Sequence, residues 1–298
     1  MSKANENPFT NRRMPLSLRL FFSFMRVAFK VLGVISPKLA GKLALRFFMT
    51  PPKITAPRRE HAVRDSATLK HQPIKHYKIA VRSWGEGPVV LLSHGWGGRG
   101  TQFFALIEAL VAAGYRVVAV DAPAHGDSTG KRTNMMDVSE ILAEVAKQEG
   151  PIEALIGHSF GSGTALLAIE WHQLPVKKVV LYGCFADVIW ITESFGKVFG
   201  MSKKVTAAMR TEALIQYKDA YASPWQWDQL SPVETIKSYS GELLLFHDEQ
   251  DYEVPYAHSQ QLDKIADNAK LITTTKLGHR KILADKDCIQ QCLEFMSD

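Results

Sequence analysis

Hydrophobic and polar residues follow one another along most of this chain in a pattern that predicts strands and helices in turn. Short apolar runs such as PVVLLS, beginning at Pro88, are typical of buried parallel strands. Amphipathic stretches separate these runs, for example Thr101 to Ala113, which Gly114 ends. The predicted strands are residues 76–84, 88–95, 115–122, 152–159, 176–183, 241–249 and 270–277. Such alternation predicts an α/β fold with a mostly parallel sheet covered by helices on both faces.

A basic attachment, residues 1–59, precedes this regular pattern. Residues 16–36 predict a helix that is apolar except for one narrow polar stripe at helical spacing. The stripe consists of Arg19, Ser23, Arg26 and Lys30. Pro37 predicts the end of this helix, and a second short helix is expected before Pro51.

The sequence leaves two alternatives for what this attachment contacts. Charges interrupt the run of about 20 apolar residues that a bilayer needs, and no small-residue cleavage site follows, so we expect neither a transmembrane span nor a secretory signal. One alternative places residues 16–50 at a membrane surface, with basic residues toward anionic lipid. The other packs the helices on the folded domain or on a second copy. The oligomeric state is left open.

A second segment, residues 185–238, is longer than a single crossover between strands requires. It contains Trp190, Trp225 and Trp227 together with several Phe and Tyr residues. We expect a small helical cap that forms the roof of a pocket. The predicted organisation is therefore an attachment over 1–59, a core over 60–184 and 239–298, and a cap over 185–238.

Charge and cysteine content narrow the class of protein. Residues 1–59 hold 12 of the 36 Lys and Arg residues and one acid, so the attachment carries +11 and the remainder −5. A nucleic-acid-binding domain would carry its positive charge on the folded body, so no nucleic-acid partner is expected. Three cysteines without a paired spacing indicate a reducing compartment. We expect a cytoplasmic protein, with peripheral contact at the inner face of the membrane under the first alternative above.

The stretch Gly157-His158-Ser159-Phe160-Gly161 carries the first candidate chemistry. An apolar strand precedes it and a helix follows, so Ser159 is predicted on a sharp turn that needs glycine on either side. Such a turn holds the hydroxyl clear of the sheet, near the N–H groups that begin the helix. His158 is expected to be structural, because its side chain should point away from that of Ser159.

A serine hydroxyl needs a base, and the base needs a group that orients it. His279 is the best candidate base, because it follows the last predicted strand. The acid should follow the strand 241–249, where Asp248 and Asp251 compete. Asp251 fits better, since it lies in the loop whereas Asp248 is nearer the strand.

Backbone N–H groups must stabilise the negative charge that develops on the attacked carbonyl oxygen. Phe160 follows the serine, and the glycine-rich loop HGWGG over 94–98 places Trp96 as the second donor. This loop lacks the spacing of either nucleotide-binding fingerprint. The remaining histidines lie on separate loops without the spacing of metal ligands, so no metal or cofactor is expected.

With these residues in place, residues 75–298 resemble the α/β-hydrolase fold superfamily. The matching motifs are HGWGG (94–98), DAPAHGDS (121–128), GHSFG (157–161), HDEQDYEVP (247–255) and GH (278–279). The resemblance implies an eight-stranded type of sheet and, in order, an oxyanion loop, a structural turn, the nucleophile turn, the acid loop and the catalytic histidine. Two positions depart from the family pattern, since Ala124 and Asp248 stand where glycine is usual.

The residues and the resemblance together predict a serine hydrolase with Ser159, His279 and Asp251 as its triad. A small-molecule carboxylic ester is the expected substrate, with a thioester or a lipid acyl ester as alternatives. The rival hypothesis is a non-catalytic member of the fold that binds or scaffolds at the membrane surface.

Overall fold

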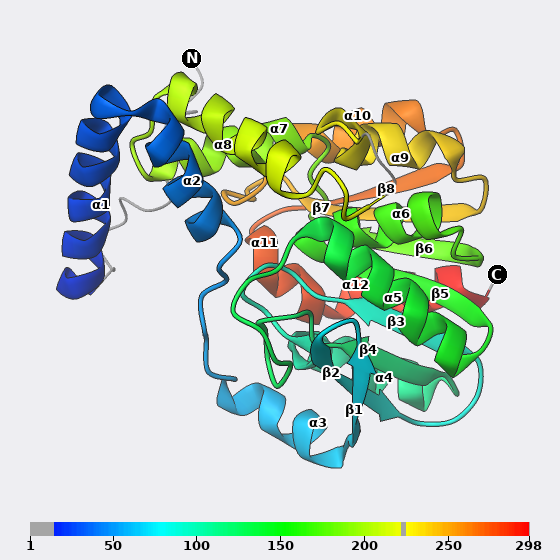
Figure 1. The fold of residues 1–298 in the computed structure, drawn as a ribbon. Helices are drawn as coiled ribbons and strands as arrows, with labels where there is room; N and C mark the ends of the chain where they lie inside the picture. Colours follow the sequence, from blue (N-terminus) through cyan, green and yellow to red (C-terminus); the bar gives the residue numbers. More distant parts are fainter. Residues whose placement is uncertain (1–14, 222–224, 298) are drawn as a thin grey trace. The chain divides into compact units, whose positions relative to one another are not determined.

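The computed structural model describes residues 15–221 and 225–297, and the chain divides into two compact units (Figure 1). The helical unit joins the N-terminal segment up to Met49 to Asp187–Gln229, and the sheet unit comprises Thr50–Ala186 and the chain from Leu230 onward. An eight-stranded sheet forms the centre of the sheet unit, in the order β1-β2-β4-β3-β5-β6-β7-β8. Its strands are β1 (Thr68–Ile74), β2 (Tyr77–Trp84), β3 (Val89–Ser93), β4 (Arg116–Val120), β5 (Ile152–His158), β6 (Val176–Tyr182), β7 (Glu242–Asp248) and β8 (Ala269–Thr274).

Strand pairing confirms the predicted, mostly parallel sheet. β2 pairs antiparallel with both β1 and β4, and every pair from β4 to β8 is parallel. The carboxyl ends of β3, β5, β6 and β7 therefore meet at one edge of the sheet. Loops at that edge carry the candidate site residues, as open parallel sheets require.

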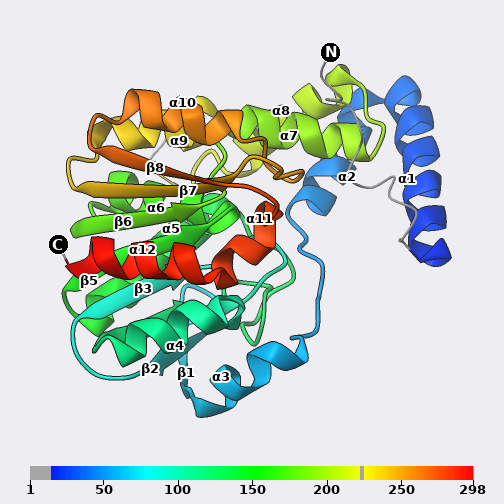
Figure 2. The ribbon, with the colours of Figure 1, turned by 180° about the vertical axis from the view of Figure 1, so that it is seen from behind.

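Helices cover both faces of the sheet, as predicted. Figure 1 looks onto the face that carries α5 and α6, and Figure 2 shows α4 and α12 on the opposite face. The helices of the sheet unit are α3 (His61–Ser66), α4 (Phe104–Ala112), α5 (Met135–Glu149), α6 (Phe160–His172), α9 (Pro232–Thr235), α10 (Ala257–Ile265), α11 (Gly278–Lys281) and α12 (Lys286–Ser297).

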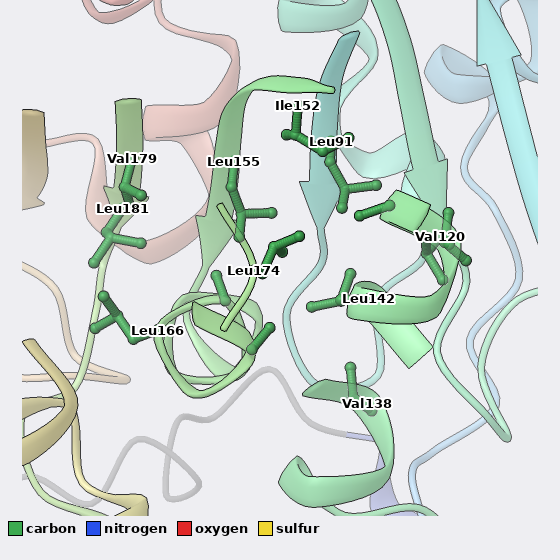
Figure 3. Close-up of a cluster of buried hydrophobic side chains, with 14 of the residues drawn as sticks. Leu91, Val120, Val138, Leu142, Ile152, Leu155, Leu166, Leu174, Val179 and Leu181 are labelled. Atoms are coloured by element: carbon green, nitrogen blue, oxygen red, sulfur yellow. The ribbon is translucent and has the colours of Figure 1, made fainter. Parts of the chain in front are cut away.

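Each face of the sheet buries its own apolar cluster. On one face, Leu142 of α5 and Leu166 of α6 pack with Leu91 of β3 and Leu155 of β5 (Figure 3). On the other face, Cys288 and Cys292 of α12 belong to a cluster with side chains of α4. Both thiols are unpaired and buried, and burial raises the pKa of each to about 12. These cysteines are therefore core residues.

Strand β1 lies in a segment for which the hydrophobic pattern predicts no strand. Its side chains are exposed except for Gln72 and Ile74, because β1 forms the edge of the sheet. An edge strand that buries so few residues produces little apolar alternation, although its backbone pairs with β2 along its whole length. Pro73 is tolerated there because an edge strand need not donate every N–H group.

Within the described residues, the helical unit contains four α-helices that come from two distant parts of the chain. They are α1 (Leu16–Ile35), α2 (Pro37–Phe48), α7 (Val188–Val198) and α8 (Lys203–Gln216). Ser36 joins α1 to α2 in an extended conformation, and its hydroxyl accepts a hydrogen bond from the Leu39 N–H at 3.3 Å. Pro37 begins α2, a position at which proline suits a helix.

Close packing of α2 on α8 unites the two parts. A Cβ on Gly41 would lie 2.7 Å from the Ala208 carbonyl carbon and 2.8 Å from the Met209 nitrogen, so the two backbones touch there. Phe29 of α1 is 1% exposed and packs against Phe47 and Phe199. The attachment and the insert, which the sequence analysis treats as separate segments, thus share one core. None of the helices described is both long and apolar enough to cross a membrane.

Candidate active site

Ser159 occupies a strained turn between β5 and α6. Its backbone has φ 53° and ψ −116°, a region that side chains other than glycine rarely adopt. The Ser159 N–H donates to the Tyr182 carbonyl at 2.8 Å, which ties the turn to the end of β6. A Cβ on Gly157 would lie 2.6 Å from the Ser162 Cα, and one on Gly161 would overlap the Ser93 carbonyl. Both flanking glycines are therefore required for the turn to close.

His279 and Asp251 form a buried pair at the same edge of the sheet. His279 Nδ1 donates to Asp251 Oδ2 at 2.6 Å, and their side chains are 4% and 1% exposed. The other carboxylate oxygen accepts from the backbone N–H groups of Glu253 and Val254 at 2.8 and 2.9 Å. Because Nδ1 carries its proton toward the carboxylate, Nε2 is left with the basic lone pair.

The electrostatics of Asp251 favour its ionised form. Burial alone would raise the pKa of this carboxyl, but hydrogen bonds from His247 and His279 outweigh burial and lower the pKa well below its usual value. A carboxylate that stays charged throughout the physiological range can hold an imidazole in one orientation. It also stabilises the imidazolium that forms when that ring takes up a proton.

The structure distinguishes Asp251 from its competitor. Both oxygens of Asp248 are occupied near β7 and β8, since Oδ1 accepts from the Gln250 N–H and Oδ2 accepts from Thr274 and from the Leu277 N–H. Asp248 therefore anchors the loop that leads to His279 without contacting the imidazole. Asp248, which stands where the family usually has glycine, therefore has a structural role.

His279 also lies beside the end of β6, next to the turn that holds Ser159. Gly183 follows Tyr182, and a Cβ on Gly183 would lie 3.0 Å from the His279 ring. Gly183 has φ 54°, so both its conformation and the space beside it exclude a side chain. Gly183 is thus a site residue that sequence reasoning missed, although a glycine directly after a buried strand is a usable signal. Within the described residues, the Ser159 hydroxyl makes no hydrogen bond.

His158 connects the serine turn to the histidine loop. Its Nε2 donates to the His279 carbonyl at 2.9 Å, and its Nδ1 accepts from Gln102 Nε2 at 3.0 Å. Burial lowers the pKa of His158 well below its usual value, and the nearby His279 adds to that effect. A neutral ring with both nitrogens occupied cannot act as a base, so His158 positions the loop of His279.

The two residues predicted to stabilise the oxyanion lie side by side. The rings of Trp96 and Phe160 meet edge to face with centroids 5.0 Å apart. Phe160 is the first residue of α6, where backbone N–H groups have no partner within the helix. The Trp96 N–H has no hydrogen-bond partner in the part of the chain that the structure describes. A Cβ on Gly95 would lie 2.7 Å from His158 Nδ1, so this loop approaches the serine turn closely.

Two further histidines brace the loop that contains Trp96. His94 accepts from the Ala122 N–H and donates to the Gly95 carbonyl, while His125 accepts from the Gly97 N–H and donates to the Pro123 carbonyl. Burial lowers the pKa of both rings, that of His125 to about 3. These neutral rings fasten the loop to the turn after β4. Among the described residues, no group of three or more His, Cys, Asp and Glu side chains is arranged so that it could hold a metal ion.

His247 supports the acid loop and was not predicted as a site residue. Its Nε2 donates to the Val254 carbonyl at 2.9 Å and lies 3.4 Å from Asp251 Oδ2, and its Nδ1 accepts from the Ser259 hydroxyl at 2.6 Å. Asp251 therefore sits between two imidazoles. These partners all lie within twelve residues of His247, in the acid loop and the first turn of α10, so the HDEQDYEVP motif was the available signal in the sequence.

The sheet unit contains a larger and a smaller cavity. A cavity of about 670 Å³ lies near the starts of β6 and β7, at the end of the sheet opposite Ser159. A smaller one of about 200 Å³ is lined by residues 52–55 and by the backbone around Gly97 and His125. The smaller cavity borders the predicted oxyanion loop, whereas the larger one is remote from the candidate chemistry.

Comparison with known proteins places these features in a family context. A family model described as alpha/beta hydrolase fold matches residues 88–232, and one described as TAP-like protein matches residues 214–296. The chain is 28% identical over 202 residues to human Protein ABHD12B, covering 65% of this chain and 53% of that protein. It is 35% identical over 129 residues to the magnesium-chelatase 30 kDa subunit of Rhodobacter capsulatus, covering 42% of this chain and 43% of that protein. The matches thus span about half the length of these relatives.

Solved structures share the same architecture. An esterase (EaEST) from Exiguobacterium antarcticum matches with a TM-score of 0.59 and 17% identity, covering 78% of this chain and all of that chain. At this level of identity the likeness concerns the fold alone.

Proposed function

Because this chain belongs to the α/β-hydrolase superfamily, we propose that it is a serine hydrolase that cleaves carboxylic esters. The observation that carries the proposal is the 2.6 Å hydrogen bond between buried Asp251 and His279, beside a serine held in a strained turn. A nucleophile, a base and a group that orients the base are the parts that acyl transfer through an acyl-enzyme requires.

In this mechanism, the Ser159 oxygen attacks the ester carbonyl and His279 Nε2 takes the hydroxyl proton. The carbonyl oxygen becomes negatively charged and is stabilised by the N–H groups of Trp96 and Phe160. When the intermediate collapses, the bond to the alcohol oxygen breaks and His279 returns the proton to that oxygen. Water then attacks the acyl-enzyme with His279 as base, which releases the acid and restores the serine hydroxyl.

Two substrate series identify the acyl group and the leaving group. A simple carboxylic ester is the default, and a thioester or a lipid acyl ester is the alternative. Hydrolysis of p-nitrophenyl esters from acetate to palmitate measures the preferred chain length. A matched thioester series distinguishes oxygen from sulfur as the leaving atom.

Labelling with a fluorophosphonate probe tests the nucleophile directly. We expect the wild type to be labelled, the S159A variant to show no labelling, and the H279A variant to react far more slowly. S240A is the matched control, because Ser240 is an exposed serine of the sheet unit outside the candidate site. Labelling of S159A at the wild-type rate, or none of the wild type, would contradict the proposal.

The rival function is that of a non-catalytic binding protein. The name of the Rhodobacter relative favours it, since that protein is a magnesium-chelatase subunit and its name does not describe a hydrolase. A binding module, however, has no need for a buried carboxylate–imidazole pair beside a strained serine. A folded wild type that neither labels nor hydrolyses any ester in the series would support the rival.

A further inference from the structure

Helix α1 has two apolar faces, and the helical unit covers only one of them. Met25 and Phe29 point into that unit and are 6% and 1% exposed. Phe24 and Val31, on the other side of the same helix, are 70% and 53% exposed. A helix that is apolar on most of its circumference needs a second apolar environment beyond the one it already has.

The exposed face forms a continuous stripe along α1. Of the fifteen large hydrophobic residues that are exposed in the described chain, nine lie on this helix. They are Leu16, Leu18, Leu20, Phe21, Phe24, Val27, Val31, Val34 and Ile35. Residues 20, 24, 27, 31 and 34 follow one another at intervals of four and three, which aligns them along a helix about 30 Å long. Scattered surface hydrophobics are ordinary, but a stripe of this extent marks an interaction surface.

Positive charge runs beside the stripe. Arg19 and Lys30 are exposed on one flank of it, and Lys38 is exposed at the start of α2. Residues 15–59 carry nine Lys and Arg residues and no Asp or Glu. On α2, Leu39 and Leu43 add exposed apolar surface at 57% and 36%, so apolar and basic surface continue together.

We propose that the exposed face of α1 lies in the interface of an anionic lipid bilayer. Its apolar side chains would enter the boundary between headgroups and acyl chains, and Arg19 and Lys30 would meet lipid phosphates. Because the opposite face of α1 is packed in the helical unit, the surface is presented by a folded platform.

Charge distinguishes this occupant from a second copy of the chain. Pairing two copies antiparallel through α1 would bring the flanks of Arg19 and Lys30 together, and in either orientation residues 15–59 supply no acidic residue to neutralise them. An anionic bilayer instead supplies both the apolar environment and the opposite charge. Each basic residue near such a surface strengthens binding by about fivefold.

Co-sedimentation of the full chain with vesicles tests the proposal. We expect binding to vesicles of phosphatidylcholine with phosphatidylglycerol, and much weaker binding to phosphatidylcholine alone. The F24E/V31E variant should lose at least tenfold in partitioning, because it places charges at the centre of the stripe. The R19Q/K30Q variant should lose about fivefold per charge on anionic vesicles and show a weaker dependence on salt.

I215E is the matched control, because Ile215 of α8 is 56% exposed in the same unit but lies off α1. It should sediment with vesicles as the wild type does, and all variants should melt at the wild-type temperature, since the changed side chains are exposed. A wild type that stays in the supernatant with both vesicles, or F24E/V31E that binds normally, would overturn the proposal. A concentration-dependent dimer that F24E/V31E abolishes, without vesicle binding, would assign the face to a second copy. None of these readouts depends on ester hydrolysis.

Discussion

The sheet unit and the helical unit use their apolar side chains in different ways. Of the fifteen exposed large hydrophobics in the described chain, the sheet unit holds three, namely Ile54, Leu69 and Tyr252. The helical unit holds the other twelve, although it is the smaller of the two. The sheet unit buries most of its large hydrophobic side chains, and many of its buried polar side chains form hydrogen bonds at the candidate active site. The helical unit buries one side of α1 and leaves the other exposed.

The two units also differ in how strictly their parts are placed. In the sheet unit, His94, His125, His158 and His247 each use both ring nitrogens to hold loops of the site. In the helical unit, small residues and aromatic rings set the packing, as at Gly41 and Phe29. Directional bonds suit a site whose chemistry depends on geometry, whereas an interaction surface needs area and charge. The following predictions test this contrast.

The largest effect is expected from the two aspartates of the acid loop. The D251N variant should reduce ester turnover by about ten-thousand-fold, because an amide no longer holds His279 in its catalytic tautomer. The D248N variant should keep most of its turnover and lose about 1–3 kcal/mol in the free energy of unfolding, since it weakens a buried anchor of the loop. Steady-state kinetics and urea denaturation measure both. The reverse ranking on turnover would show that Asp248 is the acid.

His125, which holds the loop over residues 94–98, should make the stability of the protein depend on pH. Burial lowers the pKa of His125 from its ordinary value of 6.5 to about 3, so between pH 3 and 6.5 the unfolded chain binds a proton more readily than the folded chain does. The contribution of this neutral histidine to stability is complete above pH 6.5 and is lost as pH falls toward 3. The H125N variant should be less stable than the wild type at pH 7.5. As the pH falls, however, its free energy of unfolding should decrease less steeply than that of the wild type, and the two slopes should differ by up to about 1.4 kcal/mol per pH unit. Parallel curves for wild type and variant would contradict this.

In the helical unit, the sign of the stability change caused by the G41A variant tests the packing of α2 on α8. In a helix without tertiary contact, changing glycine to alanine stabilises by about 1 kcal/mol. Here the added methyl would meet the backbone of α8, so the G41A variant should instead lose about 1–3 kcal/mol. K42A is the control, since Lys42 is exposed and its 3.7 Å ion pair with Glu212 is expected to contribute little. A more stable G41A would show that α2 and α8 do not pack as described.

The smallest effect is expected at Ala124. This residue adopts φ 65°, a conformation that costs alanine about 1–2 kcal/mol relative to glycine. The A124G variant removes that strain but adds conformational entropy to the unfolded chain, worth about 0.4–1 kcal/mol. The net result should be a stabilisation of at most about 1.6 kcal/mol, with a rise of about 6 °C or less in melting temperature. A lower melting temperature would indicate that the Ala124 methyl contributes packing that outweighs the strain.

Local sequence patterns anticipated much of the sheet unit. The apolar runs correctly placed seven strands, and the amphipathic stretch from Thr101 to Ala113 contains α4, because each element depends on neighbours a few residues away. At position 124 the family pattern has glycine and this chain has alanine. The positive φ of Ala124 explains that pattern, because glycine adopts such a backbone conformation without strain. β1 was missed, since an edge strand leaves almost no periodic burial to detect.

The sequence by itself therefore determined the order of strands and helices, the serine on its turn between two glycines, and the basic, apolar character of α1. Only the tertiary structure decided which aspartate meets His279, that Gly183 borders that pair, and that α2 packs on α8. These contacts join residues far apart in the chain. They depend on how the helices and strands pack in the tertiary structure, and a local pattern of hydrophobicity or charge does not predict that packing.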